Sequence, residues 1–113
     1  MDVFEKLNEW YQSNCDGDWE HNFGVNIETL DNPGWIVKID LYYTELEDKP
    51  FEEIEINNGD DDWLFCKVEN GKFQGAGDPS KLKKIIEIFV KWKEQYVEEK
   101  SCRKNESNYF TVE

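Results

Sequence analysis

The sequence predicts an α+β fold, in which a central antiparallel β-sheet of about four strands is flanked by an N-terminal and a long C-terminal α-helix. Apolar residues near the N-terminus recur at the spacing of one helical face, and the middle of the chain alternates apolar with polar residues as strands do. A second apolar stripe of helical period follows residue 79. A chain of 113 residues fits one domain, which we expect at 1–100 with a C-terminal tail at 101–113.

The first predicted helix spans about residues 2–14. Its acidic residues Asp2 and Glu5 stand where negative charge stabilises the N-terminal end of a helix dipole. Its apolar face consists of Val3, Phe4, Leu7, Trp10 and Tyr11.

Two alternating runs, 23–28 and 35–41, predict a β-hairpin. The segment "LDNPGW" lies between them, and a proline followed by a glycine is typical of a type II turn. In that turn Pro33 takes the first central position, and Gly34 supplies the positive φ of the second.

A second pair of strands is predicted at 51–57 and 63–69, joined by the turn "NGDDD". We expect the four strands to form an antiparallel meander. The 63–69 strand has apolar groups on both faces, so either a helix covers each face or an aromatic patch is left uncovered. One face carries Leu64, Cys66 and Val68, and the other carries Trp63, Phe65 and Lys67.

The last predicted helix spans about 79–99, with Asp78 as its cap and Pro79 at its first position. Its apolar stripe consists of Leu82, Ile85, Ile86, Phe89, Trp92 and Tyr96. The "YFTV" segment of the tail can add a short edge strand. Trp35, Trp63 and Trp92 all lie in periodic segments and are expected in the core.

Charge is distributed unevenly along the chain. There are 26 acidic and 13 basic residues, a formal net charge of −13. Residues 1–62 hold 18 Asp and Glu against 3 Lys, a net of −15, so the remainder carries +2. This balance excludes a nucleic-acid binder, which needs clustered Lys and Arg for the phosphates. Two interpretations fit it: a well-solvated surface that keeps a small domain soluble, or a surface shaped for a basic partner protein.

The compartment follows from the N-terminus and the cysteines. "MDVFEKLNEW" lacks the basic and apolar run of a signal peptide, and no stretch reaches the roughly eighteen apolar residues of a membrane span. Cys15, Cys66 and Cys102 fit neither a disulfide framework nor a CxxC pair. We expect a soluble, cytoplasmic protein with reduced thiols and no membrane partner.

The heptapeptide "CDGDWEH", residues 15–21, concentrates chemistry-bearing side chains and includes the only histidine. Structural zinc needs about four Cys or His ligands in short pairs, which the heptapeptide lacks. A calcium loop needs glycine at 21 and a bidentate Glu near 27, where His21 and Ile27 stand. The sequence therefore predicts no metal and no other cofactor.

Two interpretations of "CDGDWEH" remain. A small cytoplasmic enzyme, for instance a sulfurtransferase, could use Cys15 as nucleophile and His21 as base, although no glycine-rich anion cradle with a nearby Arg follows the cysteine. The structural interpretation needs no chemistry: Asp16 and Gly17 turn the chain after the helix, Trp19 packs under the sheet, and His21 bonds a carboxylate. We favour the second interpretation and expect no catalytic residue.

Two long segments resemble the immunity protein 53 family of bacterial polymorphic toxin systems. The first is "EWYQSNCDGDWEHNFGVNIETLDNPGWIVKIDL" at 9–41, and "DDWLFCKVENGKFQGAGDPSKLKKIIEIFVKW" at 61–92 continues it. The resemblance covers roughly residues 4–97 and omits the tail. It implies a small cytoplasmic antitoxin, encoded beside a toxin and acting by stoichiometric binding. It carries over no catalytic residue.

Taken with the charge, the resemblance predicts a basic cognate toxin, most plausibly a nuclease whose groove holds phosphates. The carboxylates of the immunity protein would then replace those phosphates. The candidate toxin-binding residues are Asp16, Asp18, Glu20 and His21 in the heptapeptide and Asp60, Asp61 and Asp62 in the second turn. The two groups share one surface only if both loops lie at the same end of the sheet.

Overall fold

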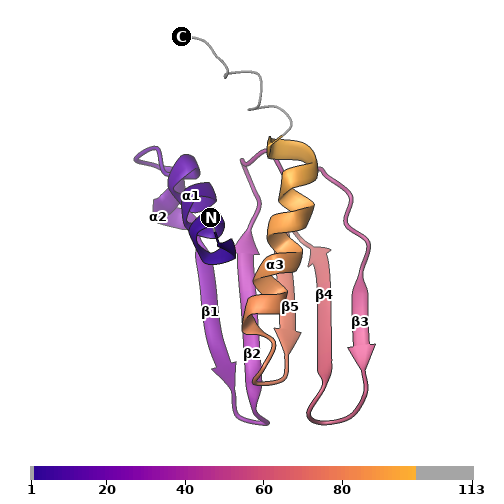
Figure 1. Cartoon of the computed structure of the whole chain (residues 1–113). Coiled ribbons are helices and arrows are strands. Elements are labelled where there is room, and N and C mark those ends of the chain that lie inside the picture. The colour runs from indigo at the N-terminus through magenta and orange to yellow at the C-terminus, as the bar shows by residue number, and fades with distance from the viewer. Residues whose placement is uncertain (1, 99–113) are drawn as a thin grey trace.

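Five antiparallel strands form one sheet in the order β1-β2-β5-β4-β3, and both long helices lie on the same side of it (Figure 1). The computed structural model describes residues 2–98, the last two by their backbone only. The elements are α1 (Val3–Asn14), α2 (Trp19–Asn22), β1 (Val25–Leu30), β2 (Gly34–Asp40), β3 (Ile54–Asn57), β4 (Trp63–Glu69), β5 (Lys72–Gly77), α3 (Leu82–Lys93) and the π-helical turn η1 (Glu94–Glu98).

The predicted α+β class is confirmed, but the meander is wrong. The segment "KFQGAG" forms the unpredicted strand β5, which pairs with β2 on one side and β4 on the other. Glycine weakens a strand, so the two glycines of this segment made its sequence resemble that of a loop. A Cβ at Gly75 would collide with Cγ2 of Ile85, so the glycine permits close packing of α3 on the sheet. As a result β3 lies at the far edge and does not pair with β2.

The hairpin of β1 and β2 is confirmed, with Val25 opposite Ile39 and Leu30 opposite Gly34. The predicted type II turn is wrong, because Gly34 does not have the positive φ that such a turn requires at its second central position. Gly34 is needed for space instead. A Cβ there would meet the carbonyl oxygen of Gly77 and lie 3.3 Å from the indole of Trp63.

The helix α1 begins as its acidic residues predict. Asp2 and Glu5 form a capping box: the Glu5 N–H donates to Asp2 Oδ1 at 2.9 Å, and the Asp2 N–H donates to Glu5 Oε1 at 3.4 Å. Leu7 and Trp10 of this helix are buried against the rest of the core.

The helix α3 begins at Leu82, three residues later than predicted, and becomes a π-helical turn after Lys93. Asp78 does not cap it. Its buried carboxylate accepts hydrogen bonds from the Trp63 N–H, the Ser80 N–H and hydroxyl, and the Lys81 ammonium, so it joins the turn before α3 to the start of β4. Residues 99–113, with Cys102 and the predicted "YFTV" strand, lie outside the described part of the chain.

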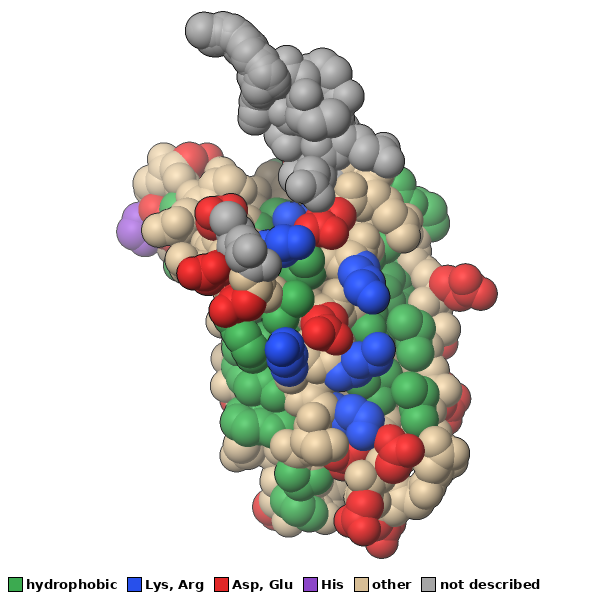
Figure 2. All heavy atoms as spheres, viewed as in Figure 1, with side chains coloured by type: hydrophobic (Ala, Val, Ile, Leu, Met, Phe, Trp, Pro, Cys, Tyr) green, Lys and Arg blue, Asp and Glu red, His purple; other side chains and the backbone are tan. Residues whose placement is uncertain are grey.

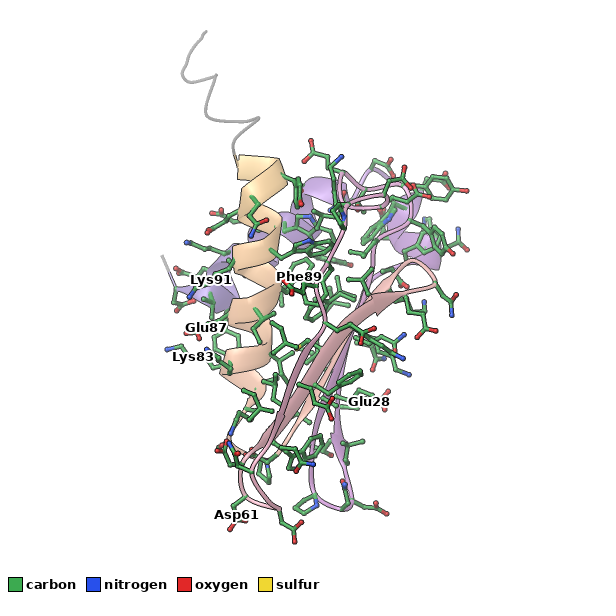
Figure 3. All side chains as sticks on the ribbon, turned by 90° about the vertical axis from the view of Figure 1, so that its right-hand side faces the viewer. Glu28, Asp61, Lys83, Glu87, Phe89 and Lys91 are labelled. Atoms are coloured by element: carbon green, nitrogen blue, oxygen red, sulfur yellow. The ribbon has the colours of Figure 1, made fainter. Side chains whose placement is uncertain are left out.

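The apolar stripe of α3 packs against the sheet as predicted. In Figure 3 Phe89 points toward the strands, whereas Lys83, Glu87 and Lys91 point away from them. Figure 2 shows the lysines gathered along this outer surface of α3. The largest fully buried side chains of the core are Val37, Ile39, Leu41, Leu46, Leu64, Phe73, Ile85, Ile86 and Phe89.

Neither long helix of the described residues lies on the opposite face of the sheet, so the second alternative for the 63–69 strand is correct. Trp63 and Phe65 lie half-buried on this uncovered face, and the Lys67 ammonium lies 5.8 Å from the Phe65 ring centre. The expectation of a core position is thus confirmed for Trp92 and wrong for Trp63. Trp35 is half-buried and packs on the margin of the core.

Candidate partner-binding surface

The candidate surface lies at the end of the sheet where β1 begins and β2 ends. Two segments distant in sequence meet there: the corner from Cys15 to Asn22, which contains α2, and the connection 41–50 between β2 and β3. The Trp19 indole N–H donates to the Tyr42 carbonyl oxygen at 2.9 Å and joins the two. We call this region the α2 end.

The corner is locked by its own carboxylates. Asp16 Oδ1 accepts the Asp18 and Trp19 N–H groups, both at 2.9 Å, and the Trp19 bond is the main cause of the lowered pKa of Asp16. Glu20 accepts the Asp16 and Gly17 N–H groups at 3.0 and 2.8 Å. Gly17 has a φ of 93°, which favours glycine. The structural role expected of Asp16 and Gly17 is therefore confirmed.

Trp19 is the buried base of an aromatic cluster. Its ring is only 6% exposed, and its centre lies 6.3 Å from that of Trp10 and 6.0 Å from that of Phe23. Phe23 in turn lies 5.7 Å from Tyr43. The cluster therefore runs from the core to the surface.

Tyr43 is the most exposed large side chain of the cluster, with 79% of its surface accessible. Its φ is 64°, in the left-handed region, and its N–H donates to Glu47 Oε1 at 3.1 Å. An apolar ring this exposed contributes little to folding, so it is available for contact with another molecule.

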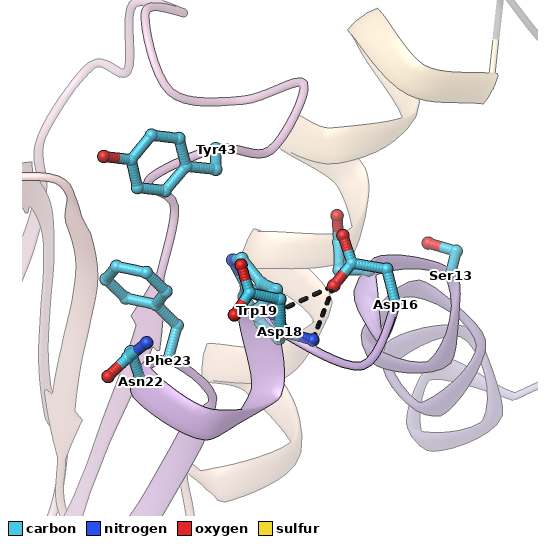
Figure 4. Close-up of a pocket in the computed structure, with 8 residues that line it drawn as sticks. Ser13, Asp16, Asp18, Trp19, Asn22, Phe23 and Tyr43 are labelled. Atoms are coloured by element: carbon cyan, nitrogen blue, oxygen red, sulfur yellow. Dashed lines mark hydrogen bonds between the residues drawn. The ribbon is translucent and has the colours of Figure 1, made fainter.

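A pocket of about 570 Å³ opens beside Tyr43. Figure 4 shows Tyr43 and Phe23 on one side of it and Asp16 and Ser13 on the other, with Asp18 and Trp19 between them. The lining residues are Ser13, Asn14, Asp16, Asp18, Trp19, Asn22, Phe23 and Tyr43.

Asp18 and His21 are exposed, and among the described residues neither side chain has a hydrogen-bond or ion-pair partner. The carboxylate contact expected for His21 is therefore not present. Asp18 borders the pocket, so its charge faces solvent there.

The second group of predicted residues lies at the other end of the sheet. Asp60, Asp61 and Asp62 form the turn between β3 and β4, where Figure 3 shows Asp61. Asp62 accepts hydrogen bonds from Asn58 at 3.0 Å and from Lys81 at 2.8 Å, and the Lys81 bond is the main cause of its lowered pKa. A strand of six residues separates the two ends by about 20 Å. The two groups do not form one compact surface.

Ion pairing also distinguishes the two ends. In the described part of the chain, Lys81 pairs with Asp62 and Asp78, and the other ion pairs are Lys6–Glu94, Lys67–Glu69 and Lys72–Asp40. None of these pairs involves an acidic residue of the α2 end. The exposed acidic residues there are Asp16, Asp18, Glu45, Glu47 and Asp48. Among the described residues none of these five forms an ion pair, although Lys72 pairs with Asp40 at the end of β2 and Lys49 lies in the 41–50 connection itself.

The chemical alternatives find no support in this geometry. The Cys15 thiol donates to the carbonyl oxygen of Tyr11 at 3.3 Å, and among the described residues no hydrogen bond joins it to His21. Burial raises the pKa of the Cys66 thiol to about 12. The described residues hold no group of three or more His, Cys, Asp or Glu side chains placed to bind a metal ion.

The contribution of the 41–50 connection was not predicted from the sequence. "LYYTELEDKP" lacks the periodicity of a helix or strand, so its sequence is typical of a loop that only connects two elements. Its composition was the available signal, because two adjacent tyrosines and three acidic residues are concentrated in ten positions.

Comparison with known proteins gives one family. The family model described as Immunity protein 53 matches residues 4–94. Neither the curated proteins nor the solved structures include a match to the chain. Within the described residues, every helix is too short or too polar to cross a lipid bilayer.

Proposed function

The chain belongs to the immunity protein 53 family, and from this we propose that it neutralises a cognate toxin by direct stoichiometric binding through the α2 end. The observation that carries the proposal is the exposed Tyr43 ring, which lies beside a pocket lined by Asp16 and Asp18; neither carboxylate forms an ion pair among the described residues. Protein–protein hot spots combine such an aromatic anchor with complementary charge.

The proposed partner is a basic protein of the nuclease type. The whole chain has a net charge of −13, and the acidic excess lies in the half that builds the α2 end. A nuclease groove is positively charged because it holds phosphates, so carboxylates of an inhibitor can occupy the same sites. This complementarity acts mainly on the association rate, whereas packing of the aromatic ring determines how long the complex lasts.

Asp16 and Glu20 contribute charge, but their oxygens already hold the corner in shape. Asp18 and His21 are exposed, and their side chains do not hold the corner in shape. They are the proposed direct contacts from the heptapeptide. The turn Asp60–Asp62 is the second candidate contact, on a partner that reaches the other end of the sheet.

The test is stopped-flow association with the toxin encoded by the neighbouring gene, at low and high ionic strength. Asp18→Asn combined with Glu45→Gln removes two charges at the α2 end. Asp60→Asn combined with Asp61→Asn removes two exposed charges at the opposite end and tests the second candidate contact. We expect the first variant to associate several-fold more slowly than wild type at low salt, and the second variant to slow association by less.

The two variants also separate the alternatives. An Asp60/Asp61 variant that slows association as much as the first variant would make the Asp60–Asp62 turn an equal contact. Rates that respond neither to salt nor to either variant would refute electrostatic recognition. Absence of any complex with the neighbouring toxin would refute the proposed function itself.

A further inference from the structure

The pocket of the α2 end has two kinds of wall. Phe23 and Tyr43 present aromatic rings whose centres are 5.7 Å apart, and Asp16 and Asp18 present carboxylates. Trp19 forms its buried base, so the pocket rests on the core. Its volume of about 570 Å³ lies within the range of pockets that hold small ligands, so it is large enough for a single side chain.

The charge of this pocket is unbalanced. The ion pairs among the described residues involve neither Asp16 nor Asp18. Of the described residues that line the pocket, two are acidic and none is a lysine or arginine. A ligand that supplies positive charge therefore meets two carboxylates that have no ion-pair partner in the described part of the chain.

We propose that this pocket receives one basic side chain of the toxin, an arginine in preference to a lysine. The inference rests on the proposed function and adds to it the chemical class of the inserted group. A planar guanidinium can lie against the Tyr43 ring and donate to the Asp18 carboxylate at the same time. A lysine ammonium lacks the flat surface and the paired donors, so it gains less from the same walls.

The proposal explains the position of Tyr43. The hydrogen bond from Trp19 to the Tyr42 carbonyl fixes the backbone beside it, and Glu47 holds the N–H of Tyr43. The backbone is thus fixed before binding, and the ring has neighbours in Phe23 at 5.7 Å and Tyr42 at 6.5 Å between ring centres. This lowers the conformational entropy that association costs.

The test is an NMR titration of the full chain with N-acetyl-arginine amide. N-acetyl-citrulline amide, which has the same shape without the charge, and N-acetyl-lysine amide are the comparison ligands. We expect saturable shifts of the Asp18 amide and the Trp19 indole N–H with arginine, with a dissociation constant in the millimolar range. Lysine should bind several-fold more weakly, and citrulline should give no saturable shift.

Two variants test whether the aromatic wall and the acidic wall of the pocket both contribute to arginine binding. Asp18→Asn and Tyr43→Asn should each weaken arginine binding at least several-fold; asparagine is chosen at position 43 because it tolerates a left-handed backbone. Asp31→Asn, in the exposed turn between β1 and β2 at the opposite end of the sheet, is the matched control and should bind as wild type does. Unchanged dispersion of the remaining amide signals shows that each variant is folded.

Equal binding of citrulline and arginine would overturn the proposal, as would shifts confined to residues outside the pocket. Toxin added to the arginine-bound protein should displace the probe, and failure to do so would overturn the assignment of the occupant. These outcomes are distinguishable from failure of the proposed function. If the toxin binds at the α2 end but no probe enters the pocket, neutralisation stands and the arginine pocket is refuted.

Discussion

Trp19 should be the residue on which both the corner and the candidate surface depend. Its indole is 6% exposed, its ring packs edge-on against Trp10, and its N–H supports the Tyr42 carbonyl. Trp19→Ala removes the ring contacts and the hydrogen bond together. Trp19→Phe keeps part of the ring packing and removes only the hydrogen bond and the larger ring system.

The size of each effect follows from these contacts. Truncation of a buried tryptophan costs about 3–5 kcal/mol, and this should apply to Trp19→Ala. For Trp19→Phe we expect about 1–2 kcal/mol, because the lost hydrogen bond contributes about 1 kcal/mol and water can reach the half-exposed Tyr42. A domain of this size loses roughly 4–8 °C of Tm per kcal/mol, so the alanine variant should melt at least about 12 °C lower.

Urea denaturation and thermal melting measure both variants. The matched control is Trp35→Ala at the opposite end of the sheet, where the indole N–H donates to the Pro79 carbonyl at 3.0 Å but the ring is only half-buried. It should cost less than Trp19→Ala. A Trp19→Ala protein that melts like wild type would refute the reasoning, because it would place the indole on the surface.

Three further outcomes are expected. Cys15→Ser should protect toxin-expressing cells within a few-fold of wild type, because a hydroxyl can also donate to the Tyr11 carbonyl; complete loss by a folded variant would indicate chemistry at the thiol. Lys81 is the main cause of the lowered pKa of Asp78, so Asp78 stabilises the fold above its unfolded-state pKa of 3.8 and this contribution is lost as the pH falls below about 4. Urea midpoints should therefore fall less steeply with acidification in Asp78→Asn than in wild type, and parallel curves would contradict this. Gly75→Ala should cost about 1–3 kcal/mol by urea denaturation, and clearly less in an Ile85→Leu background that lacks the opposing Cγ2 methyl; equal costs would show that the methyl is not the obstacle.

Local patterns predicted the parts of this protein that depend on near neighbours in the sequence. The helix at 2–14, the hairpin around Pro33, the strand at 63–69 and the apolar stripe through Phe89 were all predicted correctly. In each, apolar residues recur with a period of 3.6 or 2 residues, and that period indicates which side chains face the core. The corner at Gly17 was also predicted, because a turn is specified by a few adjacent residues.

Tertiary packing decided the rest. Strand β5 was missed because glycine opposes strand formation locally, yet α3 can approach the sheet closely only over a residue without a side chain such as Gly75. Insertion of β5 between β2 and β4 then set the strand order. The start of α3 also depended on a distant contact, because the Asp78 carboxylate bonds the Trp63 N–H across the sheet end.

The candidate surface shows the same division. The sequence by itself determined that the excess of acidic over basic residues lies in the first half and that "CDGDWEH" makes a corner. Only the tertiary structure placed Asp18 beside Tyr43 and put Asp61 at the opposite end. The physical reason is that charge and periodicity are properties of single segments of the sequence. The contact between the corner and the 41–50 connection depends instead on strand register and on the burial of Trp19, and both involve residues far apart in the chain.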